Sequence, residues 1–266
     1  MRKAIWAGML LMAAAAPAGA GVVVTQEETH PDSQGGTKTV TRTAIIQGNK
    51  QKTSGPDIVM ITDLDSGVMV TLNEKAKTAT EITLSSSGMG GFIAAGISQQ
   101  AQLKPTGAHK TVAGYGCDEF KGTGQVMGSS YTMVACFSKE APGAAEYAAF
   151  YKKLMAKMGV TMPASSPEGI ALATETETKA GNVAMPGVPP EVAKKIAEAQ
   201  AKAGPRVSRV QVTSVKTQVL PADAFAVPAG YTKQNIDVMM GGVMKGKGPS
   251  PAAPEKAAPA AEKPSD

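Results

Sequence analysis

Cysteine supplies the clearest chemistry in this sequence, because two thiols can be oxidised to a disulfide. The chain of 266 residues contains two cysteines, Cys117 and Cys136. Residues 111–120 and 129–137 hold one cysteine each and are rich in strand-forming side chains, and a glycine-rich connection joins them. The pattern predicts a β-hairpin with one cysteine on each strand.

This hairpin can bring the two sulfur atoms together. With the two cysteines directly opposite each other, the hairpin tip falls at Val126 and Met127. Paired residues of antiparallel strands lie about 4.5–5.5 Å apart at Cα, a distance that a disulfide spans. The bond would close a loop of roughly 20 residues and stabilise the fold by about 3 kcal/mol. We predict a Cys117–Cys136 bridge; the alternatives are two buried free thiols or a hairpin in another register.

Residue types used in catalysis are sparse. The two histidines, His30 and His109, lie in stretches that look like loops, and no carboxylates bracket them as a triad or zinc site requires. The sequence lacks the Gly-x-Ser-x-Gly nucleophile motif, the phosphate-binding Gly-Lys-Ser/Thr loop, the His-Glu-x-x-His zinc motif and a redox Cys-x-x-Cys. We therefore expect a protein that is not an enzyme and carries no cofactor.

Methionine is the other residue type with ligand chemistry. Met239, Met240 and Met244 cluster toward the C-terminus, and thioethers suit Cu(I) in an oxidising space. The chain has 15 methionines spread along its length, however, which is typical of a flexible apolar residue used for packing. We expect no metal site.

The N-terminus has the organisation of a secretory signal peptide. Basic residues at Arg2 and Lys3 precede an apolar run over residues 4–16 and a small-residue cleavage site that ends at Ala20. The apolar run is shorter than the roughly 20 residues that span a membrane. We predict a signal peptide over residues 1–20, a periplasmic or secreted location and no transmembrane anchor in the mature chain. An oxidising compartment favours the predicted disulfide.

Charge and composition argue against nucleic acid as a partner. The formal net charge is +5, the lysines are scattered, and aromatic residues make up 4% of the chain. A nucleic-acid surface would need basic residues gathered on one face or along one stripe. With so few aromatic residues, the core must be built from Val, Ile, Leu, Met and Ala.

Alternation of apolar and polar residues predicts most of the secondary structure. Strands are predicted over residues 22–29, 37–47, 57–62, 68–72, 78–84 and 169–178, with a short edge strand over 50–54. The runs between residues 57 and 84 form a meander. In the long strand predicted over residues 206–220, the apolar parity changes after Val212, which predicts a bulge near Thr213 and Ser214.

One helix is predicted over residues 142–158. Tyr147, Tyr151, Leu154 and Met158 recur at helical spacing, so we expect this stripe to pack the helix onto the sheet.

Three segments do not fit the strand pattern. Residues 85–100 are apolar and rich in glycine, and form either a flap over a cavity or a loop against the core. A helical insertion over about 182–205 is either weakly docked or a gate. Residues 241–266 are predicted to be a disordered tail rich in Gly, Pro, Ala and Lys, so the folded domain spans residues 21–240.

Several of these stretches resemble the bacterial domain-of-unknown-function 4412 family. They are Thr111-Val-Ala-Gly-Tyr-Gly-Cys117-Asp-Glu-Phe120, Val134-Ala-Cys136, Phe225-Ala-Val-Pro-Ala-Gly-Tyr231 and the meander. The family has no established reaction. The resemblance implies an α+β fold similar to the periplasmic lipoprotein carriers (LolA/LolB-like), in which helices cover the concave face of a strongly curved antiparallel β-sheet, a half-open barrel.

We therefore predict that the concave face binds a lipid, an acyl chain or another apolar ligand. The candidate lining residues are Ile58, Met60, Val68, Val70, Ile82, Leu84, Phe92, Ile93 and Ile97. Each buried methylene would contribute about 0.8 kcal/mol. The alternative is a structural or envelope-sensing interaction protein with a filled core, no small-molecule ligand and an envelope protein as partner.

Overall fold

The structure is a computed structural model that describes residues 20–32, 36–85, 102–126, 129–163, 165–179, 191 and 204–235. The elements are β1 (Ala20–Pro31), β2 (Thr37–Gln47), β3 (Lys50–Ser54), β4 (Ile58–Asp63), β5 (Val68–Asn73), β6 (Thr78–Thr83), β7 (Lys104–Val112), β8 (Tyr115–Val126), β9 (Ser129–Ser138), α2 (Ala144–Lys157), β10 (Ile170–Lys179), β11 (Arg206–Val219) and β12 (Thr232–Asn235).

The twelve strands form one sheet in the order β12-β6-β5-β4-β3-β2-β1-β11-β10-β9-β8-β7. Every neighbouring pair is antiparallel except β12 and β6, which run parallel. The sheet is therefore mixed and open, with β12 and β7 at its edges and without strong curling, whereas the sequence predicted a fully antiparallel, strongly curved half-open barrel. The sequence also predicted several helices on one face, whereas α2 is the single helix of the described part of the chain.

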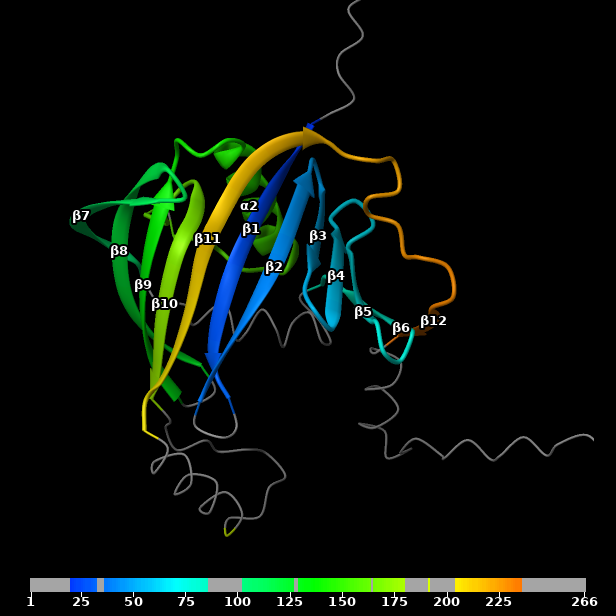
Figure 1. Ribbon diagram of the computed structural model, residues 1–266, viewed down its shortest axis with the longest axis horizontal. Helices are drawn as coiled ribbons and strands as arrows, with labels where there is room; N and C mark the ends of the chain where they lie inside the picture. Colours follow the sequence, from blue (N-terminus) through cyan, green and yellow to red (C-terminus); the bar gives the residue numbers. More distant parts are fainter. Residues whose placement is uncertain are drawn as a thin grey trace, which may run out of the picture.

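Helix α2 lies against one face of this sheet, behind β1 and β2 in the view of Figure 1. Its side chains Phe150 and Met158 are buried with Ile46 of β2 and with Leu84, which follows β6. We call this side of the sheet the helix-side face. The predicted stripe does pack inward, but Phe150, which was not part of it, is the most deeply buried aromatic residue among those that the structure describes, at 1% exposure.

The opposite face of the meander has a core of its own. Val59, Ile61, Val70, Leu72 and Ala79 are buried there, because side chains alternate between the two faces of a strand. The segment after β11 covers them with Phe225, Val227 and Tyr231. The meander is thus packed on both faces, by α2 on one side and by residues 221–231 on the other.

The Cys117–Cys136 disulfide is present, with an S–S distance of 2.11 Å and the Cα atoms 5.4 Å apart. Both cysteines belong to the buried cluster that contains Val22 and Val24 of β1. The predicted register was wrong, because Cys136 pairs with Glu119 and the bridge joins diagonal neighbours. The bond can form because the Cα separation of this diagonal pair lies within the range that a disulfide spans.

The first strand of the predicted hairpin also contains a turn that the sequence analysis missed. Val112 pairs with Tyr115, so Ala113 and Gly114 form a two-residue turn between β7 and β8, both with positive φ. Two successive positive φ values are typical of a type I′ turn, which Gly favours and Ala rarely adopts. Strand β8 then continues through residues 121–124, which were predicted to be a connection.

The other strand predictions can be compared with the sheet directly. The meander is confirmed as β4, β5 and β6. The predicted bulge in β11 is also confirmed, because the register with β1 shifts between Thr25 and Gln26 and leaves Thr213 unpaired. Strand β3 is present but lies between β2 and β4, so its prediction as an edge strand was wrong.

Candidate functional site

The predicted lining residues do not share one surface. Ile58, Met60 and Ile82 lie on the helix-side face, because they alternate with the buried residues of the opposite core. Leu84 is buried beneath α2. Val68 and Val70 point to the opposite face, where they pack near the segment after β11. Phe92, Ile93 and Ile97 lie outside the described residues, as do the predicted flap and most of the helical insertion.

Ile58 and Met60 differ from the other apolar side chains of this face. Their exposed fractions are 42% and 39%, whereas Ile46 and Leu84, which lie under α2, are at most 5% exposed. Their neighbours across the strands are polar: Met60 pairs with Thr53 of β3 and Thr71 of β5. The helix-side face therefore carries two accessible apolar side chains away from the helix core.

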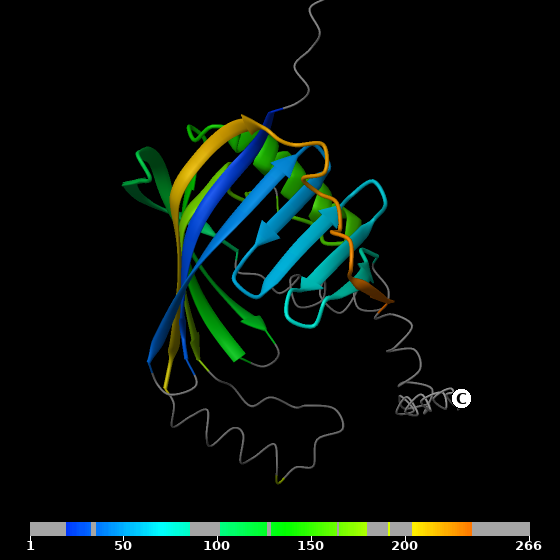
Figure 2. The ribbon, with the colours of Figure 1, turned by 45° about the vertical axis from the view of Figure 1, so that its right-hand side comes forward.

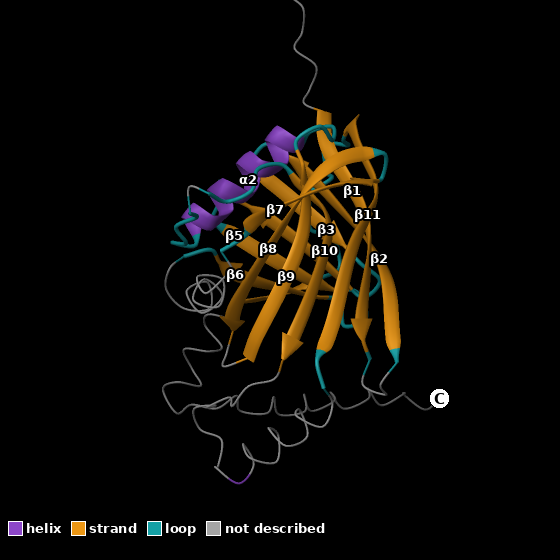
Figure 3. Cartoon of the chain, turned by 90° about the vertical axis from the view of Figure 1, so that its left-hand side faces the viewer, coloured by secondary structure: helices purple, strands orange, loops and turns teal. Residues whose placement is uncertain are grey.

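The helix-side face changes from apolar to polar along β1. Val22 and Val24 are buried at the end where α2 lies, which Figure 3 shows near one end of the long strands. The next side chains on the same face are Gln26, Glu28 and His30. The same face thus passes from an apolar core to a polar surface within one strand.

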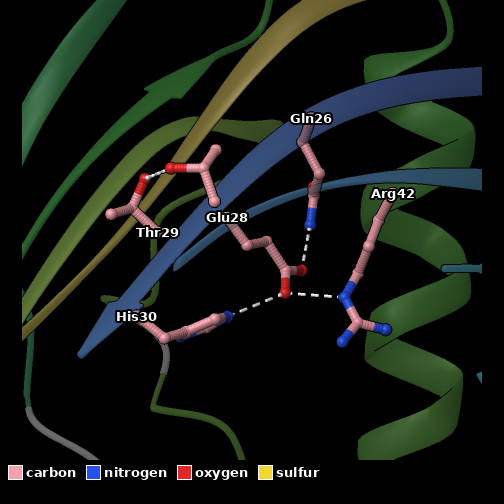
Figure 4. A network of polar contacts seen from close by, with 6 residues as sticks. Gln26, Glu28, Thr29, His30 and Arg42 are labelled. Atoms are coloured by element: carbon pink, nitrogen blue, oxygen red, sulfur yellow. Dashed lines mark hydrogen bonds and ion pairs between the residues drawn. The ribbon is translucent and has the colours of Figure 1, made fainter. Parts of the chain in front are cut away.

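These polar side chains form a network around Glu28 (Figure 4). Gln26 Nε2 donates a hydrogen bond of 2.8 Å to Oε1 of Glu28, and Arg42 Nε of β2 donates one of 2.6 Å to Oε2. His30 Nε2 lies 3.2 Å from the same Oε2. Pairing of Gln26 with Arg42 across the two strands places these groups on one face.

The network keeps Glu28 ionised. Its side chain is 14% exposed, and burial alone would raise its pKa. The hydrogen bonds from Gln26, Arg42 and His30, together with the charge of Arg42, outweigh that cost and lower the pKa of Glu28 below its ordinary value. Glu28 is therefore a fixed negative charge that orients the Arg42 side chain.

The Arg42 side chain lies over Gly55, which separates it from Ile58. A side chain at Gly55 would come within 2.9 Å of Arg42 Nη1, so the guanidinium occupies the space above this residue. Gly55 in turn donates a backbone hydrogen bond of 3.0 Å to the carbonyl of Ile58. The polar network and the exposed apolar side chains are therefore adjacent on the helix-side face.

Further charged side chains lie where the polar network meets the exposed apolar side chains. Lys38 pairs with His30 across β1 and β2. Asp57 accepts an ion pair of 2.8 Å from Lys75, and the hydrogen bond and charge of Lys75, with a smaller contribution from Lys38, lower the pKa of Asp57. Glu28 and Asp57 therefore each have a basic partner, and Lys38 adds a further positive charge.

Two surface clefts were not predicted from the sequence. One, of about 440 Å³, lies at the ends of β8, β9 and β10 and is lined by Thr123, Gly124, Gln125, Ser130, Tyr131, Thr132, Glu177 and Lys179. The other, of about 470 Å³, is lined by Gln47, Asn49, Lys50, Asp65, Ala222, Phe225 and Ala226. Their linings are mostly polar, and neither contains a predicted ligand residue.

Residues with catalytic chemistry do not converge in the described part of the chain. His30 and His109 lie on strands β1 and β7, so their prediction as loop residues was wrong. His109 forms an exposed ion pair of 2.5 Å with Asp118. Among the described residues, no three His, Cys, Asp or Glu side chains are grouped as a metal ion would require. Met239, Met240 and Met244 lie outside these residues.

The tyrosines of α2 serve packing. Tyr147 and Tyr151 contact each other with their ring centres 4.7 Å apart, and burial raises the pKa of Tyr147 well above its usual range. The Tyr151 hydroxyl accepts a hydrogen bond of 2.9 Å from the buried Gln51. No helix that the structure describes has the length and apolar character needed to span a membrane.

Comparison with known proteins gives a family and several similar folds. Residues 36–231 match the family "Domain of unknown function (DUF4412)". No curated protein matches the chain. Two solved structures are similar to this chain: an outer membrane lipoprotein-sorting protein domain from Vibrio parahaemolyticus (8% identity, TM-score 0.32, covering 77% of this chain and 89% of that one) and a LolA superfamily protein from Nitrosomonas europaea (10%, 0.29, 78% and 90%).

A larger protein also contains a similar region. PNGF-II matches with 13% identity and a TM-score of 0.41, and the alignment covers 86% of this chain. The chain spans about a third of the length of PNGF-II, since the aligned part is 33% of that protein.

Proposed function

The chain belongs to the DUF4412 family, whose description assigns no activity, and we propose that it is an exported, non-enzymatic protein that binds a lipid or acyl chain on the helix-side face of its sheet. The observation that carries this proposal is the exposure of Ile58 and Met60 on a face where Ile46 and Leu84 are packed under α2. Apolar side chains gathered beside polar groups are typical of a ligand site.

The apolar part of the ligand would lie along Ile58, Met60 and the half-buried Ile82. Cross-strand pairing of Met69 with Ile82 and of Thr62 with Met69 places these side chains on one face, on β4 and β6 with β5 between them. At about 0.8 kcal/mol for each buried methylene, a chain of ten carbons gains several kcal/mol from such a surface. A long apolar chain therefore needs few polar contacts to bind.

Export accounts for the disulfide. Disulfides persist in oxidising compartments and are rare in the cytosol, and the Cys117–Cys136 bond is buried in the core of the described chain. The signal peptide expected over residues 1–20 would direct the chain to the periplasm or beyond.

Binding of a fluorescent, dansyl-labelled fatty acid tests the proposal. Replacing both side chains, as Ile58→Ser with Met60→Ser, should weaken binding at least tenfold, because tenfold corresponds to about 1.4 kcal/mol, or about 55 Å² of lost apolar contact. Met162→Ser is the matched control, because Met162 is 41% exposed but lies outside the sheet. Equal affinity of the double variant and the wild type would contradict the proposal.

A second function follows from a different observation. Phe150 and Met158 fill the space between α2 and the sheet, so this half of the helix-side face has no room for a ligand. If the rest of the face is also closed by protein contacts, the chain is a structural or envelope-sensing interaction protein. Native mass spectrometry of material purified from its own host separates the two, because a carrier should retain added lipid mass.

A further inference from the structure

Resting on the proposed function, we propose that the ligand is an anionic amphiphile whose carboxylate or phosphate oxygens bind the terminal nitrogens of Arg42 while its apolar chain lies over Ile58 and Met60. The apolar residues do not define the head of the ligand. Arg42 can bind such a head because of how Glu28 holds it, the charges around it and its position beside Ile58.

Glu28 holds Arg42 by one edge. The hydrogen bond of 2.6 Å uses Nε, and the dashed line in Figure 4 ends there, so the two terminal nitrogens are directed elsewhere. The Arg42 side chain is 30% exposed. A guanidinium has five N–H donors, and its terminal pair matches the two oxygens of a carboxylate or phosphate. Glu28 thus acts as a positioning residue that leaves the binding edge of Arg42 available.

Glu28 does not cancel the positive character of the site. Its carboxylate also accepts hydrogen bonds from Gln26 and His30, which partly offset its negative charge. Lys38 lies next to His30 and forms no ion pair within the described part of the chain. The other nearby carboxylate, Asp57, has Lys75 as its partner at 2.8 Å. An anion at Arg42 would therefore meet the positive charges of Arg42 and Lys38, while Glu28 and Asp57 each have a basic partner.

The distance between head site and chain site suits a single molecule. Arg42 is on β2 and Ile58 begins β4, so two strand spacings, about 10 Å, separate their backbones. Gly55 lies between them, and the Arg42 guanidinium occupies the space above it, so the head site lies toward Ile58. An acyl chain attached to a head group at Arg42 would start beside Gly55 and reach Ile58 and Met60 within its first ten or so carbons.

The test compares three probes that share a twelve-carbon chain: dodecanol, laurate and monododecyl phosphate. Each is titrated as a competitor of the dansyl-labelled fatty acid. The wild type should bind at least one anionic probe tenfold or more tightly than dodecanol. Preference for laurate indicates a fatty-acid carboxylate, and preference for the phosphate indicates a phospholipid-type head.

Two arginine variants make the test specific. Arg42→Gln should remove the preference for the anion and leave the affinity for dodecanol within about twofold. Arg209→Gln is the matched control, because Arg209 also uses Nε to bind a carboxylate, Glu175 Oε2 at 2.7 Å, but points to the opposite face through its pairing with Thr29. This control should keep the full preference.

The outcomes separate failure of this inference from failure of the proposed function. If dodecanol and the anions bind equally, or if Arg42→Gln keeps the preference, the head-group site is refuted while apolar binding stands. If none of the three probes binds the wild type, the apolar site fails and the head-group site fails with it. Arg42→Lys provides a second variant, since it keeps the charge and should retain part of the preference.

Discussion

Removal of the disulfide is the perturbation whose magnitude follows most directly from the structure. Cys117 and Cys136 are 19 residues apart in sequence, so the bond closes a loop of about 20 residues in the unfolded chain. The chain-entropy relation gives about 3 kcal/mol for a loop of this size. For a domain of roughly 200 residues, each kcal/mol shifts Tm by about 2–4 °C, so the variant should melt about 6–12 °C lower.

Alanine is the right replacement at both positions. The two cysteines are 5% and 2% exposed, so a serine hydroxyl would be buried and would add a desolvation cost unrelated to the cross-link. The double variant Cys117→Ala with Cys136→Ala also leaves no single thiol to form dimers. Its thermal unfolding should be followed by circular dichroism and compared with that of the wild type, both without reductant.

A strong reductant provides the internal control. It should lower the Tm of the wild type toward that of the double variant and leave the double variant unchanged. Equal melting of the two proteins under oxidising conditions would refute the reasoning, because the cross-link would then contribute nothing to the folded state. It would also remove the main structural support for an oxidising compartment.

Two further predictions concern the helix and the polar network. Phe150→Ala should lower the unfolding free energy by about 3–5 kcal/mol in urea titration, because the ring is 1% exposed and its loss leaves a cavity. Met162→Ala is the control: its site is exposed, so its unfolding free energy should stay within about 0.5 kcal/mol of that of the wild type. The pKa of Glu28 is lowered in the folded protein, so its charge stabilises the fold above the ordinary value of about 4.3, and this stabilisation is lost as pH falls through the lower folded pKa. The stability difference between wild type and Glu28→Gln should accordingly shrink between pH 6 and pH 3, and a constant difference would contradict the assignment.

Local patterns were enough to predict most strands. Strand β2 was predicted over residues 37–47, and the structure has it at Thr37–Gln47, because its alternation is regular and turn residues flank it. The β11 bulge could be predicted because an extra residue shifts the apolar parity, and Thr213 is that residue. These features depend on neighbours in sequence, so the sequence contains them.

The turn between β7 and β8 shows where local patterns fail. Ala113 adopts a φ of 52°, a conformation for which alanine carries no sequence signal. The glycines of β8 caused the opposite error. Gly124 was predicted to lie in a connection, but it is part of the strand and pairs with Tyr131 across the sheet. The Tyr131 ring lies over Gly124, and a side chain there would be 2.6 Å from it. A cross-strand aromatic residue supports a glycine in this way, but the partner is not adjacent in sequence.

The choice of face could not be made from the sequence. Parity divides each strand into two sets, and it separates Val68 and Val70 from Met69 correctly. Which set lies under α2 depends on residues 221–231, which cover the other set with Phe225 and Val227. The polar network was missed for a related reason, although its signal was present: Gln26, Glu28 and His30 continue the parity of the buried Val22 and Val24.

The lengths of the elements explain why one face carries two kinds of chemistry. Helix α2 has 14 residues and is about 21 Å long, whereas β1 has 12 residues and extends about 40 Å. The helix alone cannot cover β1 from end to end, and a side chain beyond its reach must tolerate water or bind something else. Gln26, Glu28 and His30 meet that requirement by being polar. Ile58 and Met60 do not, since both are apolar and exposed on the same face. An exposed polar residue at either position would be solvated by water, so a bound apolar chain is the role that we propose for these two side chains beside Arg42.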